Sequence, residues 1–217
     1  MPHARTAHWD GVYRNKAATE LSWYEPRPAE SLVLLRSTGA VFDDPILDVG
    51  GGASLLVDEL LALGFRDLSV LDVSSEVLGQ VRRRLGPRGA SVDYIQSDVS
   101  AFRPARPYAL WHDRAVFHFL VEPGERRAYV AALRAALRPA GHAVIATFGP
   151  SGPQRCSGLP TMRYDASGLA AELGPWLRLL DSRLVVHRTP AGSEQQLLYC
   201  LFGSTAVVPD RDVRTIG

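Results

Sequence analysis

Cysteine is nearly absent from this sequence, which contains only Cys156 and Cys200 among its 217 residues. Two cysteines in a chain of this length do not form the disulfide framework of a secreted protein, so we expect a reducing, cytoplasmic location. Their sequence neighbours contain no pattern of metal ligands. The sequence therefore predicts no metal site.

Long apolar runs and an excess of one charge are also missing. No apolar segment reaches the eighteen or so residues of a membrane span, and no signal-peptide core stands near the start, so no membrane partner is expected. The 24 basic and 23 acidic residues give a net charge of +1, without the basic excess of a nucleic-acid binder. The dense basic run at residues 82–84 lies on a predicted helix and is interpreted as a solvated face.

A glycine turn at residues 50–52 separates an apolar run at 45–49 from an amphipathic segment at 54–63. This order predicts a strand, a tight turn and a helix, the unit that carries nucleotides in open α/β sheets. Glycine suits the turn because a side chain would keep the backbone from closing on a ligand.

Strands and helices alternate through most of the remaining sequence. Further strands are predicted at residues 68–73, 92–96, 108–112 and 143–148, and helices at 28–37, 74–85, 122–137 and 167–173. Residues 179–187 and 195–202 flank a Pro-Gly turn and predict an antiparallel edge hairpin. The fold class is therefore α/β: a Rossmann-like open twisted sheet of seven mostly parallel strands, with helices on both faces.

Two irregular segments frame this core. Residues 1–8 are interpreted as a loose leader, after which Trp9, Tyr13, Trp23 and Tyr24 form an aromatic N-terminal segment. These aromatics either cover one edge of the sheet or form a lid over a cleft. Residues 149–160 predict a loop without regular structure, and such long loops are often functional.

An acidic residue stands at the end of each of four consecutive predicted strands. These residues are Asp48, Asp72, Asp98 and Asp113. Parallel strands bring their carboxyl ends to one rim, where open α/β sheets bind ligands. Any one of the acids has an ordinary structural explanation, because aspartate favours strand ends. Together they predict a small-molecule cleft.

The motif series resembles that of the class I S-adenosylmethionine-dependent methyltransferases. The resemblance covers about residues 40–150 and includes Asp48-x-Gly50-x-Gly52, Asp72, Asp98 and the Leu137-Arg138-Pro139-Ala140-Gly141 segment. Ser54 stands where many members have glycine, and Ala140 replaces a common glycine. The resemblance implies an N-terminal helical lid at residues 1–40, an S-adenosylmethionine-binding domain at 41–203 and a flexible tail at 204–217.

The resemblance also implies roles for individual residues. Gly50, Gly51 and Gly52 would let the backbone approach the methionine part of the cofactor, Asp72 would accept bonds from the ribose hydroxyls, and Asp98 would accept one from the adenine amino group. The full predicted cofactor set is Trp9, Tyr13, Tyr24, Asp48, Gly50, Gly51, Gly52, Asp72, Val73, Ser74, Ser97, Asp98, Val99, His112 and Asp113. S-adenosylhomocysteine would be the product.

Two other ligand classes stay open. A dinucleotide-dependent oxidoreductase would need glycine at position 55, where this sequence has leucine. A non-catalytic binding module on the same fold would bind no methyl donor.

The methyl acceptor is open as well. The main hypothesis is in-line displacement onto a small molecule bearing a thiol, hydroxyl, carboxyl or amine group, as in the thiopurine methyltransferases, which also have aromatic N-terminal segments. The alternative is a protein lysine, because Trp9-Asp10-x-x-Tyr13 and Glu20-x-x-Trp23 are similar to lysine methyltransferases acting on elongation factor 1-alpha. If a base is needed, the candidates are His118, His112, Asp113 and His187.

Overall fold

The structure is a computed structural model that describes residues 2–205. From residue 206 onward, the predicted tail lies outside the described residues. The helices are α1 (Pro2–Asn15), α2 (Ala29–Ser37), α3 (Leu56–Ala62), α4 (Ser75–Leu85), α5 (Pro123–Ala136) and α6 (Ala166–Leu173), with short 3-10 turns at Ala18–Glu20, Gly86–Gly89, Val99–Ala101 and Phe117–Phe119. The strands are β1 (Ile46–Val49), β2 (Leu68–Asp72), β3 (Asp93–Gln96), β4 (Tyr108–Arg114), β5 (Leu137–Phe148), β6 (Arg155–Cys156), β7 (Leu159–Pro160), β8 (Leu177–Arg188) and β9 (Glu194–Ser204).

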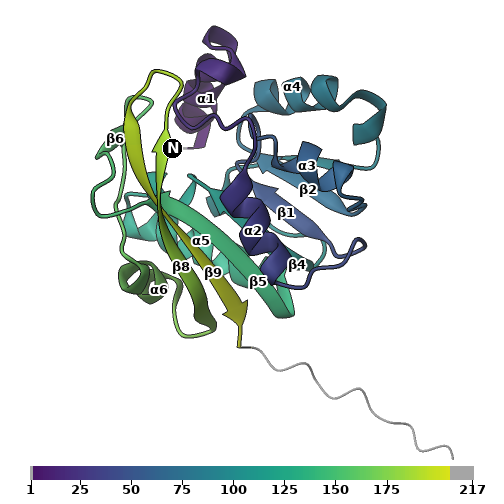
Figure 1. The fold of residues 1–217 in the computed structure, drawn as a ribbon, viewed down its shortest axis with the longest axis vertical. Helices are drawn as coiled ribbons and strands as arrows, with labels where there is room; N and C mark the ends of the chain where they lie inside the picture. Colours follow the sequence, from purple (N-terminus) through teal and green to yellow (C-terminus); the bar gives the residue numbers. More distant parts are fainter. Residues whose placement is uncertain (1, 206–217) are drawn as a thin grey trace, which may run out of the picture.

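Seven strands form the central sheet in the order β3-β2-β1-β4-β5-β9-β8 (Figure 1). β1 to β5 are parallel, whereas β9 runs antiparallel to both of its neighbours, β5 and β8. This arrangement confirms the predicted fold class and the antiparallel edge hairpin. The strand order reverses between β1 and β4, which is the position where such sheets bind ligands.

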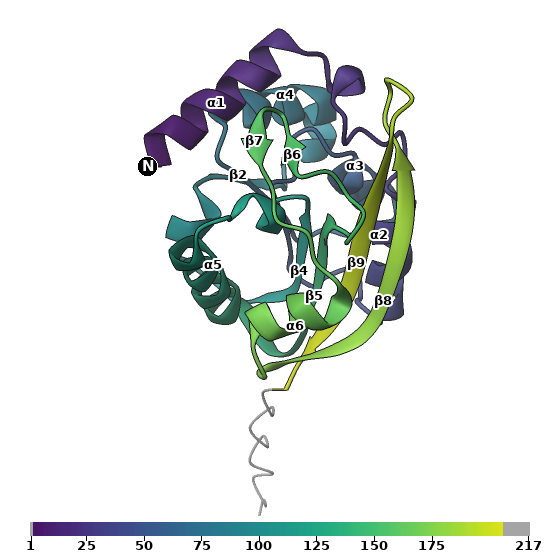
Figure 2. The same cartoon turned by 90° about the vertical axis from the view of Figure 1, so that its left-hand side faces the viewer.

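The sheet separates two apolar cores because successive side chains of a strand point to opposite faces. Ile46, Val70 and Leu110 pack with residues of α2, α3 and α4. Their sequence neighbours Leu47, Leu71 and Trp111 pack with α5 and α6 on the other face. Figure 2 shows α5 and α6 together on one side of the sheet, with α2 and α3 beyond it. Both faces are covered, as the alternating pattern predicts.

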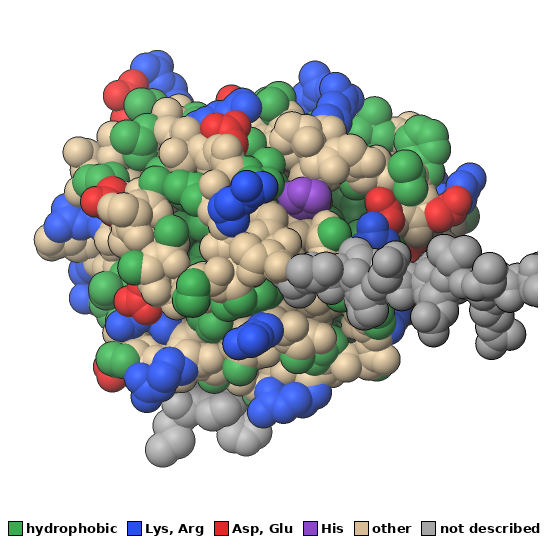
Figure 3. All heavy atoms as spheres, turned by 90° about the horizontal axis from the view of Figure 1, so that it is seen from below, with side chains coloured by type: hydrophobic (Ala, Val, Ile, Leu, Met, Phe, Trp, Pro, Cys, Tyr) green, Lys and Arg blue, Asp and Glu red, His purple; other side chains and the backbone are tan. Residues whose placement is uncertain are grey.

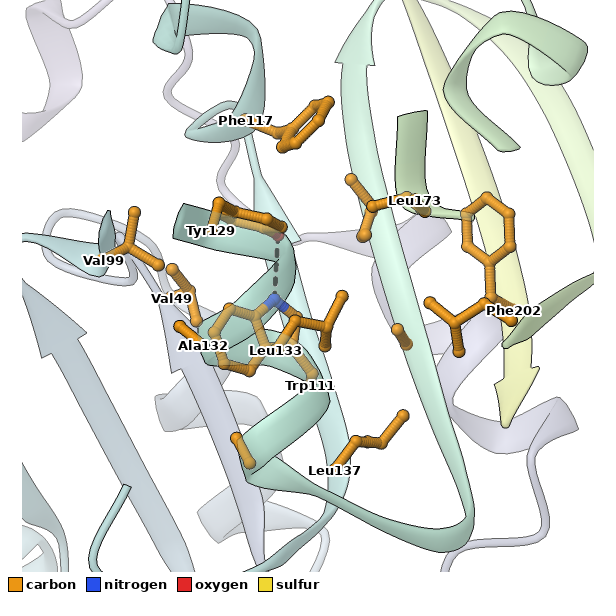
Figure 4. Close-up of a cluster of buried hydrophobic side chains, with 14 of the residues drawn as sticks. Val49, Val99, Trp111, Phe117, Tyr129, Ala132, Leu133, Leu137, Leu173 and Phe202 are labelled. Atoms are coloured by element: carbon orange, nitrogen blue, oxygen red, sulfur yellow. Dashed lines mark hydrogen bonds between the residues drawn. The ribbon is translucent and has the colours of Figure 1, made fainter. Parts of the chain in front are cut away.

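The largest core side chain, Trp111, is anchored by a hydrogen bond as well as by packing (Figure 4). Its indole Nε1 donates to the Tyr129 hydroxyl of α5 at 2.9 Å, and the two rings meet edge to face. Val49 and Phe117 belong to the same cluster. The hydrogen bond therefore fixes the position of α5 along β4.

For residues 2–8, the part of the predicted loose leader that the structure describes, the prediction is wrong. They belong to α1, which begins at Pro2 and packs against α4. Within this stretch Arg5 pairs with Asp98 at 2.8 Å, and further along Asp10 accepts a hydrogen bond from the Ser74 hydroxyl at 2.5 Å. These contacts are long-range, so the sequence pattern of this segment does not reveal them.

The loop predicted at residues 149–160 also has regular structure. β6 and β7 form a two-residue antiparallel ladder, with Arg155 opposite Pro160 and Cys156 opposite Leu159. A ladder this short has no period that a sequence can show. It brings Cys156 under the N-terminal segment, where its sulfur lies 3.7 Å from the Ser22 hydroxyl.

The face in Figure 3 shows basic and acidic side chains scattered among apolar ones, without a continuous basic stripe. Within residues 2–205, no helix combines the length and the hydropathy that crossing a bilayer would require.

Candidate active site

A cavity opens at the carboxyl ends of the parallel strands, at the rim predicted from the four acids. It encloses about 1070 Å³ between protein atoms, part of it open to solvent. α1 forms one wall through Arg5, Trp9 and Tyr13, and the hairpin strands add His187, Gln195 and Leu197.

Most of the predicted site residues line this cavity. They are Trp9, Tyr13, Asp48, Gly50, Gly51, Asp72, Val73, Ser97, Asp98, Val99, His112, His118 and His187. Four predicted residues are not among the lining residues: Tyr24, Gly52, Ser74 and Asp113. Tyr24 instead packs with Leu21 and Ala53 behind the wall.

Asp72 ends β2 and is held by backbone amides. Its Oδ1 accepts from the Ser74 amide at 2.9 Å, and its Oδ2 accepts from the Gly52 amide at 3.3 Å. Burial raises the pKa of Asp72 to about 7, although these amides favour the carboxylate, and the nearby Asp48 charge adds to the increase. Ser74 and Gly52 therefore position this acid without lining the cavity.

The glycine turn leaves no room for side chains. Gly50 has φ +64, and a Cβ there would lie 2.1 Å from Val116; a Cβ on Gly51 would lie 2.3 Å from Asp48 Oδ2. Glycine is needed at position 50 for its backbone conformation and at both positions for space. The turn thus brings bare backbone next to the Asp48 carboxylate.

Asp48 belongs to a buried chain of hydrogen bonds. Its Oδ1 lies 2.7 Å from His112 Nδ1, and His112 Nε2 lies 2.9 Å from the Ser31 hydroxyl of α2. All three side chains are buried. Asp48 Oδ2 is also buried but has no partner among the described residues. Both His112 nitrogens are engaged, so His112 positions Asp48 and is not free to act as a base.

Asp98 carries a partner that the sequence did not reveal. Its Oδ1 accepts from the Ser100 amide at 2.9 Å, and its Oδ2 pairs with Arg5 of α1 at 2.8 Å. Arg5 also pairs with Glu125 at the start of α5. The N-terminal helix is therefore tied to the acid at this end of the cavity.

The structure places Asp113 away from the cavity, in the core below it. The fully buried carboxylate accepts from the Val116 amide at 2.8 Å, the Phe117 amide at 3.2 Å and the Tyr129 hydroxyl at 2.7 Å. Burial raises the pKa of Asp113 to about 6, although these hydrogen bonds favour the carboxylate. Asp113 thus braces the turn after β4, where Ala115 has φ 74. It shapes the wall and does not contact the cavity.

His118 lines the cavity and is completely buried. Its ring stacks on Phe148 with centroids 4.3 Å apart, and its Nδ1 accepts from the Phe148 amide at 3.2 Å. Burial, aided by the Arg114 charge, lowers the pKa of His118 to about 3. The imidazole is therefore neutral throughout the physiological range.

Arg114 and His187 fasten the N-terminal segment to the sheet. Arg114 donates to the Trp23 carbonyl at 2.7 Å and pairs with Glu25 at 2.8 Å. His187 Nε2 lies 2.7 Å from the Ser22 carbonyl, and its Nδ1 lies 3.5 Å from Glu25. Despite the cost of its burial, Glu25 has a lowered pKa because of His187 and Arg114.

Several lining residues were missed by sequence reasoning, notably Arg5, Phe119, Phe148, Gln195 and Leu197. Phe148 ends β5, so the last residue of a fifth predicted strand, considered like the ends of the first four, would have pointed to it. Gln195 and Leu197 lie on β9, for which the rule makes no prediction. Within residues 2–205, no group of three or more His, Cys, Asp or Glu side chains could hold a metal ion.

Residues 46–141 match the family model described as a methyltransferase domain. The matched segment begins with β1 and covers the glycine turn and the acids described above. It ends within β5.

Curated relatives match about half of the chain. A malonyl-[acyl-carrier protein] O-methyltransferase of Halalkalibacterium halodurans is 32% identical over 115 residues, which are 50% of this chain and 41% of that protein. A ubiquinone biosynthesis O-methyltransferase of Serratia proteamaculans is 28% identical over 117 residues, 53% of this chain and 47% of the relative. The chain therefore spans less than half the length of these relatives.

Solved structures extend the likeness to nearly the whole chain. The Burkholderia thailandensis 1,6-didemethyltoxoflavin-N1-methyltransferase, solved with its namesake compound and S-adenosylhomocysteine, superposes with a TM-score of 0.67 at 23% identity. The match covers 94% of this chain and 91% of the other. At this level of identity the likeness establishes a shared fold.

Proposed function

We propose that the chain is a class I S-adenosylmethionine-dependent methyltransferase that methylates a small molecule; the methyltransferase-domain match over residues 46–141 and the curated relatives support this. The donor is S-adenosylmethionine and the product is S-adenosylhomocysteine. The dinucleotide alternative does not agree with the family match, and the non-catalytic alternative does not agree with matches to enzymes.

The observation that carries the proposal is the fit between the cavity's acids and this donor. S-adenosylmethionine presents an ammonium group, two ribose hydroxyls and an adenine amino group, all of them hydrogen-bond donors. The cavity offers three carboxylates at the ends of successive strands: Asp48, Asp72 and Asp98. The buried and unpartnered Asp48 Oδ2, beside a turn with no room for a Cβ, is a place where a ligand donor would be satisfied.

In this proposal each carboxylate has one task. Asp48, held by His112, faces the ammonium end; Asp72 accepts from the ribose hydroxyls; Asp98 accepts from the adenine amino group, with Arg5 balancing its charge. When bound, the cofactor supplies a methyl group on a sulfonium, which is transferred by in-line displacement. The aromatic wall of Trp9, Tyr13 and Phe119 limits the access of water and holds the acceptor in line.

A small-molecule acceptor is favoured by the relatives and by the cavity. One curated relative is named as a malonyl-[acyl-carrier protein] O-methyltransferase and the other as a ubiquinone biosynthesis O-methyltransferase, and the solved neighbour is named for 1,6-didemethyltoxoflavin. No observation favours the protein-lysine alternative. The similarity at Trp9, Tyr13 and Trp23 reflects aromatic packing, since these three rings contact one another.

The proposal is tested by thermal unfolding with S-adenosylhomocysteine. At a hundredfold excess over Kd, a ligand stabilises the folded state by about 2.7 kcal/mol, which should raise Tm by roughly 5–10 °C for a chain of this size. NAD⁺ is the matched control and should leave Tm unchanged. An unchanged Tm with S-adenosylhomocysteine, or an increase with NAD⁺ alone, would contradict the proposed function.

The affinity for S-adenosylhomocysteine should depend on pH through Asp72. The ribose hydroxyls need the ionised carboxylate, and the pKa of Asp72 without ligand is about 7. Binding should therefore weaken about tenfold between pH 8 and pH 6, since each pH unit below that pKa costs up to a factor of ten. Calorimetry in buffers of different ionisation enthalpy should also show proton release at pH 6.5.

The raised pKa of Asp72 has the opposite effect on folding without ligand. A carboxyl whose pKa is higher folded than unfolded binds more protons in the folded state. Its contribution to stability is therefore largest below about pH 4 and is lost as the pH rises through 7.

The binding prediction has its own contrary outcome. If the affinity for S-adenosylhomocysteine is constant from pH 6 to pH 8, the Asp72 carboxylate has no role in binding.

A further inference from the structure

The cavity has two chemically different sides. The three lining acids, Asp48, Asp72 and Asp98, lie on the side proposed for the cofactor. The opposite side, called the acceptor side here, is formed by the N-terminal segment and by residues from β4 onward, across the strand-order reversal between β1 and β4, and includes Trp23, Arg114, His118, Phe119, Phe148 and His187. Among these described lining residues none is acidic, so a cationic acceptor would meet no carboxylate in the wall.

His118 supplies a hydrogen-bond donor to the acceptor side. Its Nδ1 accepts from the Phe148 amide, so in the neutral ring the proton is on Nε2. Nε2 is buried and has no hydrogen-bond partner among the described residues. A buried N–H without an acceptor costs about 1–3 kcal/mol. A ligand oxygen at this position would remove that cost.

The same wall offers no free base. Both nitrogens of His112 are engaged, and the unprotonated nitrogen of His118 is occupied by a backbone amide. His187 lies between the Ser22 carbonyl and Glu25, so its ring also acts as a donor. Cys156 remains a thiol because burial raises its pKa. An acceptor that must lose a proton finds no group to take it.

Arg114 adds positive charge beside His118. Its side chain is only 9% exposed and is bound to the Tyr199 hydroxyl, the Trp23 carbonyl and Glu25. The Arg114 charge is close enough to lower the pKa of His118. Glu25 balances this charge, so the wall combines the Arg114–Glu25 ion pair and an unpartnered N–H between aromatic side chains.

Building on the proposed function, we propose that the methyl acceptor is a carboxylic acid on an aromatic or otherwise apolar skeleton, bound as its carboxylate to His118 Nε2–H beside Arg114. A carboxylate is ionised at neutral pH and needs no base. One of its oxygens forms the new O–C bond while the methyl carbon leaves the donor sulfur, which keeps the bonding electrons. The products are a methyl ester and a neutral thioether, and no proton moves.

Alcohols, phenols and thiols carry a proton that would have to be removed, and protonated amines have no free electron pair. A neutral heteroaromatic nitrogen needs no base, but one that accepts from His118 has no lone pair left for the methyl carbon. A carboxylate can accept from His118 with one oxygen and attack the methyl carbon with the other.

The test is a panel of ligands from benzoate to indole-3-acetate, each compared with the alcohol and the amine of the same carbon skeleton. Binding is followed by tryptophan fluorescence in saturating S-adenosylhomocysteine, because Trp9 and Trp23 lie in the wall. The carboxylates should bind at least tenfold more tightly than their matched partners. Ester formation with S-adenosylmethionine should follow the same order.

Two variants test His118 itself. His118→Phe keeps a ring to stack on Phe148 but removes the donor, and should reduce the preference for carboxylates to about twofold or less. His118→Gln places an amide N–H near the position of Nε2 and should restore part of the preference. Carboxylate binding by the wild type should be constant between pH 7 and pH 9, because His118 does not ionise there.

Three results would overturn the inference: alcohols or amines that bind as tightly as carboxylates, a preference that survives in His118→Phe, or no saturable carboxylate binding up to 10 mM. The increase in Tm with S-adenosylhomocysteine is recorded for every variant. If that increase is present while the carboxylate preference fails, the carboxylate inference is wrong and the proposed methyl-donor function stands.

Discussion

Replacing Asp72 by alanine is expected to weaken S-adenosylhomocysteine binding by roughly a hundredfold or more. In the proposed complex its carboxylate accepts two ribose hydroxyls, and a hydrogen bond to a charged group contributes about 1.5–3 kcal/mol. Loss of both corresponds to at least two factors of ten in Kd, each about 1.4 kcal/mol. Calorimetry at pH 8, where the wild-type carboxylate is ionised, measures the difference.

Two further variants separate binding from folding. Asp72→Asn keeps an oxygen for the Ser74 amide but loses the acceptor for the Gly52 amide, and the removal of a buried charge offsets this loss, so it should melt close to the wild type while binding weakly. Asp93→Asn changes an acid at the start of β3 that is 67% exposed and should leave both properties unchanged. If Asp72→Ala binds within threefold of the wild type, the assignment of the ribose hydroxyls to Asp72 is wrong.

Replacing Asp113 by alanine should instead affect stability. The change leaves two backbone amides and the Tyr129 hydroxyl without their acceptor in a fully buried place. Each unsatisfied donor costs about 1–3 kcal/mol, so a total loss of about 3–5 kcal/mol is expected. For a chain of this length that is a decrease in Tm of roughly 6–20 °C. Denaturant unfolding gives the free energy directly.

The pH dependence and a milder variant complete this test. Because the pKa of Asp113 is raised, the folded protein binds more protons at this residue than the unfolded chain does. The contribution of Asp113 to stability therefore decreases as the pH rises through about 6. Tyr129→Phe removes only one of the three donors and should destabilise less, although it also removes the acceptor for Trp111. An Asp113→Ala protein with wild-type stability but no methyl transfer would restore Asp113 as a catalytic candidate.

The sheet and the three lining acids could be predicted because they depend on local pattern. Asp48 lies near the end of β1, Asp72 ends β2 and Asp98 comes two residues after β3, and parallel strands present such residues at one rim. The same rule placed Asp113 in the cavity, and this was wrong. β4 continues for two residues past the predicted end, so Asp113 lies inside the strand and points to the α5 face.

The remaining parts of the site depend on contacts between distant segments. Ser31 meets His112 across 81 positions of sequence, and Arg5 meets Asp98 across 93. Neither Ser31 nor Arg5 belongs to a sequence motif. Each reaches its partner because of the position in which its helix packs. The tautomer of His118, which lies in a 3-10 turn, likewise depends on the Phe148 amide at the end of β5.

The position of β9 has a consequence for how the protein is made. β9 is the last strand of the described chain to be synthesised, yet it lies inside the sheet between β5 and β8. The parallel strands and their helices can assemble as the chain emerges, but β8 has no partner until β9 arrives. Gln195 and Leu197 of β9 also complete the wall of the cavity. A nascent chain that stops short of residue 194 would therefore expose the edge of β5 to association with other chains.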